Sequence, residues 1–289
     1  MGVDQAESLR RRLGSGGGSP PLRVIAVTSG KGGVGKTHVA ANLAVLAARA
    51  GRRVLIIDAD LGLANVEIVY GIAPRYHLGH LLDGVATLDD VLASGPHGIR
   101  VLPAGAGTQE LTHLDEERRL RLIGALDPVE DRFDTVIIDS GAGIGENVLF
   151  FVGAAQEAIL VVNTEPTSLT DSYAAVKVLS KTMGVRRFGL LVNQTPGEVT
   201  ARETFERLAG ITDRFLDVEL RYLGSLPRDE NVHRAVMVQR PVVDLFPQSP
   251  VSRALADIAG KLFDSPPPRH LDGGIKFLWE RLFREAAAR

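Results

Sequence analysis

Two lysines, a threonine and four glycines gather in one short stretch of the chain, Gly30 to Thr37. An apolar run from Leu22 to Val27 precedes this stretch, and a helix-like pattern from Ala40 to Arg49 follows it. A phosphate-binding P-loop requires this strand–loop–helix context, because glycines let backbone N–H groups approach phosphate oxygens closely. Lys36 is predicted to reach the β- and γ-phosphates of a nucleotide, and Thr37 to hold Mg²⁺ through its hydroxyl. The residues predicted to contact the nucleotide are Gly30, Lys31, Gly32, Gly33, Val34, Gly35, Lys36, Thr37 and His38.

Aspartates follow two further apolar runs that are typical of buried strands. Asp139 comes directly after Thr135–Ile138, while Asp58 and Asp60 come after Val54–Ile57. Asp139 is predicted to bind Mg²⁺ through a water, as a Walker B aspartate does, and Asp58 to add an outer-shell contact. Asp60 is the candidate for orienting the attacking water; the alternative is that Asp58 and Asp60 only cap a turn. The predicted metal ligands are thus Thr37, Asp58 and Asp139, and the predicted catalytic residues are Lys31, Lys36 and Asp60.

Two other strand ends carry residues suited to a nucleotide base. Asn193 follows the strand-like run Phe188–Val192, and its amide can donate and accept hydrogen bonds at a base edge. Pro227 ends the next strand-like run and is predicted to pack on adenine. Other chemistries lack support, because the seven histidines show no zinc-type spacing and Ser140–Gly143 lacks the G-x-S-x-G arrangement of a hydrolase.

Strand-like and helix-like patterns alternate along the chain from Leu22 onward, which predicts an α/β fold with a doubly wound, mainly parallel sheet flanked by helices. In such sheets ligands bind at the carboxyl ends of the strands, so the P-loop and the aspartates should converge on one edge. Leu120 and Ile123 of a helix over 115–126 are expected to face inward, and 88–93 is expected to be a short helix. Further strands are predicted at 99–102, 158–162 and 222–226, and further helices at 65–70, 78–82, 147–155, 168–183, 199–215, 231–239 and 250–263.

Composition excludes several classes of protein. The chain has 289 residues, 45% of them hydrophobic, which suits one large α/β domain, predicted to span 22–263. Its formal net charge of −2 and the lack of a basic stripe argue against direct binding of nucleic acid. There is no cysteine, so neither a disulfide scaffold nor cysteine chemistry is expected. The start of the chain has no apolar core of a signal peptide, and no apolar run is long enough to span a membrane.

The first 13 residues form a short charged segment on a flexible linker, 14–21. Ala6, Leu9 and Leu13 would share one face of a helix. The segment suits a peptide that docks on a partner, although composition alone favours a frayed terminus.

A proline-rich spacer, 264–272, separates the domain from a second terminal segment, 273–289. This segment would form an amphipathic helix with a wide apolar stripe, flanked by Lys276 and Arg281. Such a helix suits a membrane interface, and the alternative is a helix packed on the core or on a dimer partner. The residues of the stripe, predicted to face the membrane, are Ile275, Leu278, Trp279, Leu282 and Phe283.

Besides Lys36, the glycine-rich stretch carries a lysine directly after its first glycine, Lys31. With this lysine the stretch resembles the deviant Walker A motif of the MinD/ParA family of ATPases. The resemblance runs from about Val24 to Lys261 and includes 58–65, 139–144, 163–171 and 224–227. It implies ATP or ADP with Mg²⁺ as ligands, slow hydrolysis, and an ATP-dependent homodimer in which Lys31 reaches the partner's nucleotide. His38 departs from the small polar residue that many relatives carry, and little effect is expected from its side chain.

Within that family the chain most resembles the regulators of flagellar number, the FlhG group. Two segments support this, 60–65 and 239–243. The N-terminal stretch also resembles that group's activator of the GTPase FlhF, which implies that Asp4, Gln5, Ala6, Leu9 and Arg10 bind this partner. The C-terminal segment resembles the group's membrane-targeting helix.

The resemblance therefore implies a cytoplasmic switch that joins the inner face of the cell membrane when it carries ATP. Flagellar switch-complex proteins or a flagellar transcription regulator are further candidate partners. Two alternatives remain: a MinD-type ATPase that positions the division site, and a non-enzymatic adaptor with a structural nucleotide.

Overall fold

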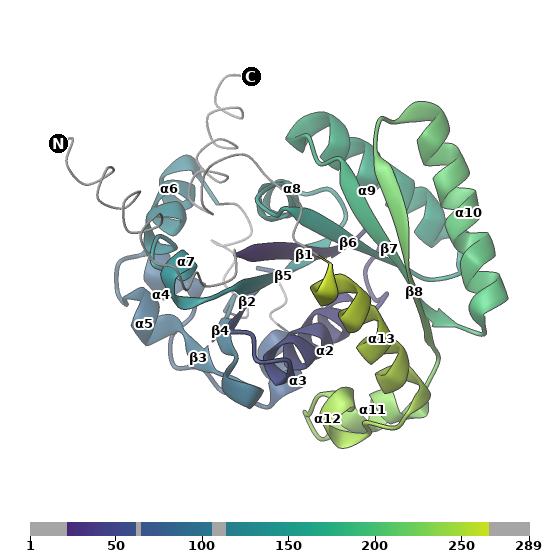
Figure 1. Cartoon of the computed structure of the whole chain (residues 1–289). Coiled ribbons are helices and arrows are strands. Elements are labelled where there is room, and N and C mark those ends of the chain that lie inside the picture. Colours follow the sequence, from purple (N-terminus) through teal and green to yellow (C-terminus); the bar gives the residue numbers. More distant parts are fainter. Residues whose placement is uncertain (1–21, 62–64, 106–113, 266–289) are drawn as a thin grey trace, which may run out of the picture.

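The structure, a computed structural model, describes residues 22–61, 65–105 and 114–265 (Figure 1). No helix in these ranges is long and apolar enough to cross a bilayer. The terminal segments fall outside the ranges, and with them the residues predicted to bind a GTPase or a membrane: Asp4, Gln5, Ala6, Leu9, Arg10, Ile275, Leu278, Trp279, Leu282 and Phe283.

Within the described ranges, eight strands form one sheet in the order β3-β4-β2-β5-β1-β6-β7-β8. Neighbouring strands are parallel except β3 and β4, which confirms the predicted mainly parallel sheet. The strands are Arg23–Ser29 (β1), Val54–Ala59 (β2), Ala93–Ser94 (β3), Arg100–Leu102 (β4), Thr135–Ala142 (β5), Glu157–Val162 (β6), Arg187–Thr195 (β7) and Glu219–Pro227 (β8).

Helices cover both faces of the sheet, and two apolar cores separate them from it (Figure 1). The central strand shows why both faces must be covered. Val24 and Ala26 point into one core, and Ile25 and Val27 point into the other, because successive side chains of a strand face opposite sides.

The first core lies under helices that are labelled α4 to α10. They are Leu78–Leu82 (α4), Leu88–Val91 (α5), Glu116–Ala125 (α6), Val129–Arg132 (α7), Glu146–Gly153 (α8), Pro166–Met183 (α9) and Glu198–Phe215 (α10). The second core lies under Lys36–Arg49 (α2), Val66–Tyr70 (α3), Glu230–Met237 (α11), Val242–Leu245 (α12) and Pro250–Asp264 (α13). A 3₁₀ turn, Pro96–Gly98, precedes β4.

Two local predictions were wrong. Leu120 is 47% exposed, because the buried stripe of α6 is built by Leu122 and Ile123, and Leu120 lies about 200° around the helix from Leu122. The predicted helix over 88–93 ends at Val91, and Ala93 begins the short antiparallel strand β3. The short elements β3, α7 and α12 were not predicted, since each has too few residues to show a period.

The strand order sets where a ligand can bind. The P-loop follows β1 in the middle of the sheet, and β5 and β6 lie on either side of β1. The next strand beyond β5 is β2, and its register pairs Asp58 with Asp139. The predicted convergence of these residues at one edge is therefore confirmed.

Candidate active site

The glycine-rich loop joins β1 to α2 and needs its glycines for two different reasons. Gly33 and Gly35 have φ angles of 76° and 93°, a left-handed conformation that favours glycine. A Cβ at Gly30 would lie 2.2 Å from the backbone carbonyl carbon of Asp171, so the loop passes too close to α9 for any side chain. Lys36 is the first residue of α2, which places the positive end of the helix at the loop.

Asp139 lies fully buried beside the start of α2. Among the described residues, neither of its carboxylate oxygens has a hydrogen-bond partner of ordinary geometry. Burial raises the pKa of Asp139 well above its usual value, and the charge of Asp58 adds to this, while the Thr37 hydroxyl and Lys36 oppose it. A buried carboxylate without full compensation is suited to a cation. Thr37 and Asp139 therefore fit Mg²⁺, whose role when bound is to neutralise charge on the phosphates.

Asp58 is engaged by the backbone. Its carboxylate accepts hydrogen bonds from the N–H groups of Asp60, Asn65 and Val66, at 3.2, 2.9 and 3.1 Å. Burial raises its pKa to about 7, although these three hydrogen bonds lower it. The contacts agree with the turn-capping alternative for Asp58, because they hold the segment that leads into α3. An outer-shell contact to the metal stays a prediction.

Asp60 lies across from the end of β5. A Cβ at Gly141 would lie 3.6 Å from Asp60 Oδ1, so the Asp60 carboxylate packs against this strand end. The register that pairs Ala59 with Ser140 explains the contact. Its predicted role toward water also stays a prediction.

Lys31 turns toward α9. Its Nζ lies 2.6 Å from Glu165 Oε2 and 3.1 Å from Thr167 Oγ1, and both groups are at the start of that helix. The hydrogen bond with Lys31 holds the pKa of Glu165 below its usual value. Lys31 is thus held within its own chain here, and its predicted reach into a partner's site stays a prediction.

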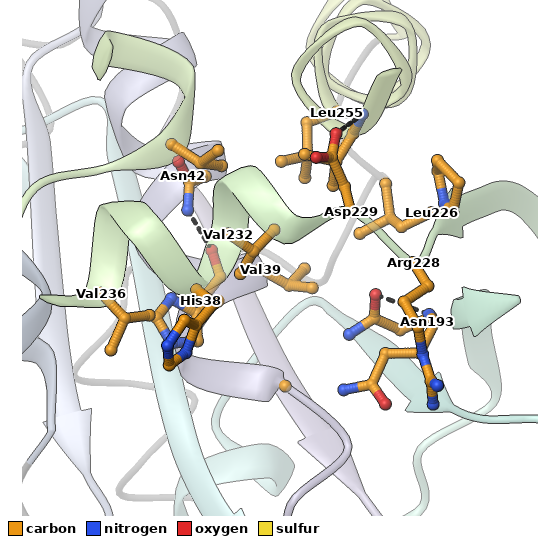
Figure 2. Close-up of a pocket in the computed structure, with 16 residues that line it drawn as sticks. His38, Val39, Asn42, Asn193, Leu226, Arg228, Asp229, Val232, Val236 and Leu255 are labelled. Atoms are coloured by element: carbon orange, nitrogen blue, oxygen red, sulfur yellow. Dashed lines mark hydrogen bonds between the residues drawn. The ribbon is translucent and has the colours of Figure 1, made fainter. Parts of the chain in front are cut away.

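A pocket of about 350 Å³ opens beside Gly35 (Figure 2). The structure brings Asn193 and Pro227 together here, as expected for a base site. Figure 2 shows Asn193 and Arg228 on one side and His38 on the other. His38 was predicted to contact the nucleotide with little effect expected from its side chain, and it lines this pocket. Other lining residues, from α2, α11, α13 and the turn between β8 and α11, were not predicted. The missed residues include Val39, Asn42, Arg228, Asp229, Val232, Val236 and Leu255.

Comparison with known proteins settles the family. Residues 25–242 match the family model described as the CobQ/CobB/MinD/ParA nucleotide binding domain. The chain belongs to this family. This MinD/ParA-family ATPase is also 46% identical to "Antiactivator FleN" of Pseudomonas aeruginosa, over 94% of the chain and 97% of the relative.

Two further proteins are similar to most of the chain. "Flagellum site-determining protein YlxH" of Helicobacter pylori is 30% identical over 91% of the chain and 90% of that protein. The septum site-determining protein MinD of Pyrococcus horikoshii, solved in complex with Mg-ADP, is 29% identical in sequence. It superposes with a TM-score of 0.70 over 83% of this chain and 96% of that one.

The geometry explains how such an ATPase works with its own residues. Lys36 begins α2 directly after the loop, and both Lys36 and Thr37 interact with Asp139. A nucleotide's phosphates would bind at the loop and Lys36, and Thr37 with Asp139 would hold the metal. Lys36 and Asp139 are buried, so charge on a transferring phosphate can be stabilised with little reorganisation of these two side chains. The ATPase therefore depends on positioning more than on covalent chemistry.

Proposed function

We propose that this ATPase is a dimerising, membrane-associating switch that regulates the number and placement of flagella. The observation that carries the proposal is the similarity to the antiactivator FleN, which spans nearly the whole of both chains. The similarity to the flagellum site-determining protein YlxH supports the same pathway.

ATP and Mg²⁺ would bind at the loop, and two subunits would then pair face to face. In this arrangement Lys31 leaves Glu165 and enters the site of the partner. Asp60 orients water for hydrolysis, which resets the dimer to monomers. The nucleotide thus acts as a switch between two assembly states.

The C-terminal segment, 273–289, would attach the dimer to the cytoplasmic face of the cell membrane. One short amphipathic helix binds a bilayer weakly, whereas two on one body gain avidity. Membrane association would therefore follow dimerisation and require ATP.

The variant Asp60→Ala tests the switch. It should bind ATP but hydrolyse it slowly, and so accumulate as a dimer on liposomes. Sedimentation with liposomes and light scattering in solution measure this. Lys31→Ala is the matched control and should stay monomeric. A second control is Asp83→Ala, which changes an exposed acid directly after α4 and should behave as the unmodified chain. The switch model is wrong if Asp60→Ala stays monomeric in excess ATP.

The N-terminal segment would stimulate a GTPase of the FlhF type. The test compares GTP hydrolysis by that GTPase with a peptide of residues 1–20 and with the same peptide carrying Gln5→Ala. Stimulation that the substitution removes would support the flagellar role and make the segment its effector.

The alternative is a MinD-type ATPase that positions the division site. The similarity to the P. horikoshii MinD, with 29% identity and the same fold, supports it. It predicts the same dimer and membrane switch without an activator segment. No stimulation of the GTPase by either the peptide or the full chain would favour this alternative.

A further inference from the structure

Asn193, expected from the sequence to read the base, makes a hydrogen bond with the phosphate loop itself. Its Nδ2 donates to the backbone carbonyl of Val34 at 2.7 Å. Its Oδ1 accepts from the N–H of Gln194 at 2.9 Å. These two partners fix the orientation of the amide, because a carbonyl can only accept and an N–H can only donate.

The Val34 carbonyl belongs to the same peptide group as the N–H of Gly35. The described peptide bonds are all trans, so the C=O and N–H of one peptide point in opposite directions. Because the Val34 carbonyl points toward Asn193, the Gly35 N–H points away from Asn193. The neighbours fix this peptide further, since the Val34 side chain is buried in the second core and the Gly35 carbonyl accepts from Val39 N–H at 3.1 Å.

The fit between the two residues is close. A Cβ at Gly35 would lie 2.4 Å from Asn193 Nδ2, so the amide occupies the space that a side chain there would need. Gly35 also has a φ of 93°, which independently favours glycine. The loop peptide and the amide are thus built to contact each other.

Backbone irregularity at the end of β7 brings the amide to this position. The pairing of β7 with β8 shifts between Val192 and Thr195. Gln194, inside the shift, has a φ of 56°, an uncommon conformation for a residue with a side chain. Such bulges re-aim a side chain next to a functional site.

We infer that Asn193 is a positioning residue of the phosphate cradle, which orients the Gly35 N–H toward the phosphates whether or not it also contacts the base. The inference rests on the proposed binding of ATP at this loop. It adds Asn193 to the loop residues that determine how tightly the phosphates are bound. In this role, the chemistry that Asn193 serves is that of the triphosphate.

Inorganic tripolyphosphate separates the two roles, because it has the phosphates of ATP and no base. The affinities of ATP and of tripolyphosphate, each with Mg²⁺, are measured by competition with a fluorescent ATP analogue on the full chain. Asn193→Ala should weaken both ligands by a similar factor of about tenfold, as expected for one hydrogen bond that positions a charged ligand. Asn193→Asp, which keeps the shape but cannot donate, should do the same or worse. Pro227→Ala is the matched control on the base side and should weaken ATP alone.

Turnover gives a second readout. A misplaced cradle should lower kcat about tenfold, since donors aimed at the developing charge stabilise the transition state. Loss of ATP affinity with unchanged tripolyphosphate affinity, or a higher KM with unchanged kcat, would overturn the inference. Circular dichroism and the unfolding midpoint identify any variant that fails to fold. If Asn193→Ala fails to fold, the affinities and kcat of Asn193→Asp test the inference. The comparison of ATP with tripolyphosphate requires no hydrolysis, so the inference can fail while the proposed switch stands.

Discussion

The lysine that distinguishes this loop is held by a contact within its own chain. Lys31 pairs with Glu165 and Thr167 at the start of α9, on the part of the molecule that follows β6. The pair is exposed, with side-chain accessibilities of 38% and 56%, so water and salt weaken it. In the proposed switch, such a contact would oppose dimerisation only slightly and would be released when a partner's nucleotide offers more negative charge.

Removing the acid should make the dimer easier to form. In Glu165→Gln, Lys31 loses its charged partner, so we expect dimerisation at a severalfold lower ATP concentration in low salt. Light scattering across an ATP titration measures this. The control is Glu206→Gln, an exposed acid on α10, which should leave the titration unchanged. A weaker dimer in Glu165→Gln would instead assign Glu165 a contact across the interface.

At the scale of elements, α4 begins with a cap built from two histidines. His77 Nδ1 accepts from the N–H of Gly79 at 3.1 Å, and His80 Nδ1 accepts from the N–H of His77 at 3.2 Å. Both bonds require unprotonated Nδ1 atoms. Burial lowers the pKa of His77, the neighbouring His80 adds to this, and Asp83 opposes it.

The cap should make stability depend on pH. Because the pKa of His77 is lower in the folded chain, its contribution is fully present above about 6.5, the unfolded pKa, and is lost as the pH falls through the folded value. The free energy of unfolding should therefore fall more between pH 7.5 and 5.5 in the unmodified chain than in His77→Ser, whose hydroxyl caps at any pH. Urea unfolding at the two pH values measures this. An equal fall in the free energy of unfolding in both proteins would show that the His77 cap does not cause the pH dependence.

At the scale of the whole molecule, one buried arginine joins three distant elements. Arg23, at the start of β1, is 2% exposed and pairs with Glu157 of β6 at 2.6 Å. Its Nη1 also donates to the carbonyl of Ser265, directly after α13, at 2.9 Å. The arginine thus joins the residue directly after α13 to the strand that leads to the P-loop.

Loss of this arginine should be costly. Arg23→Ala leaves Glu157 partly buried without its partner and the Ser265 carbonyl without its donor, so we expect a loss of about 3 kcal/mol in the free energy of unfolding. Urea unfolding measures it. Arg202→Ala, which removes an exposed pair with Glu198, should cost less than about 0.5 kcal/mol. A similar cost for both variants would show that the Arg23 contacts contribute little.

The sequence alone was sufficient for features that depend on local physics. Hydrophobic periodicity predicted the alternation of strands and helices, and the glycines with Lys36 and Thr37 predicted the phosphate loop, because both signals arise from neighbouring residues. The rule that parallel strands end at one edge also predicted that Asp58 and Asp139 would meet, which the register confirms.

Only the tertiary structure decided which side chains complete the site. Lys31 meets Glu165 across 134 residues, and Asn193 meets the Val34 carbonyl across 159. His38 lines a pocket whose other walls include residues of β7, β8, α11 and α13. Such contacts depend on strand order and on a bulge in β7, neither of which leaves a periodic trace in the chain. The sequence therefore determined the kind of chemistry, and the packing of distant elements determined how its groups are held.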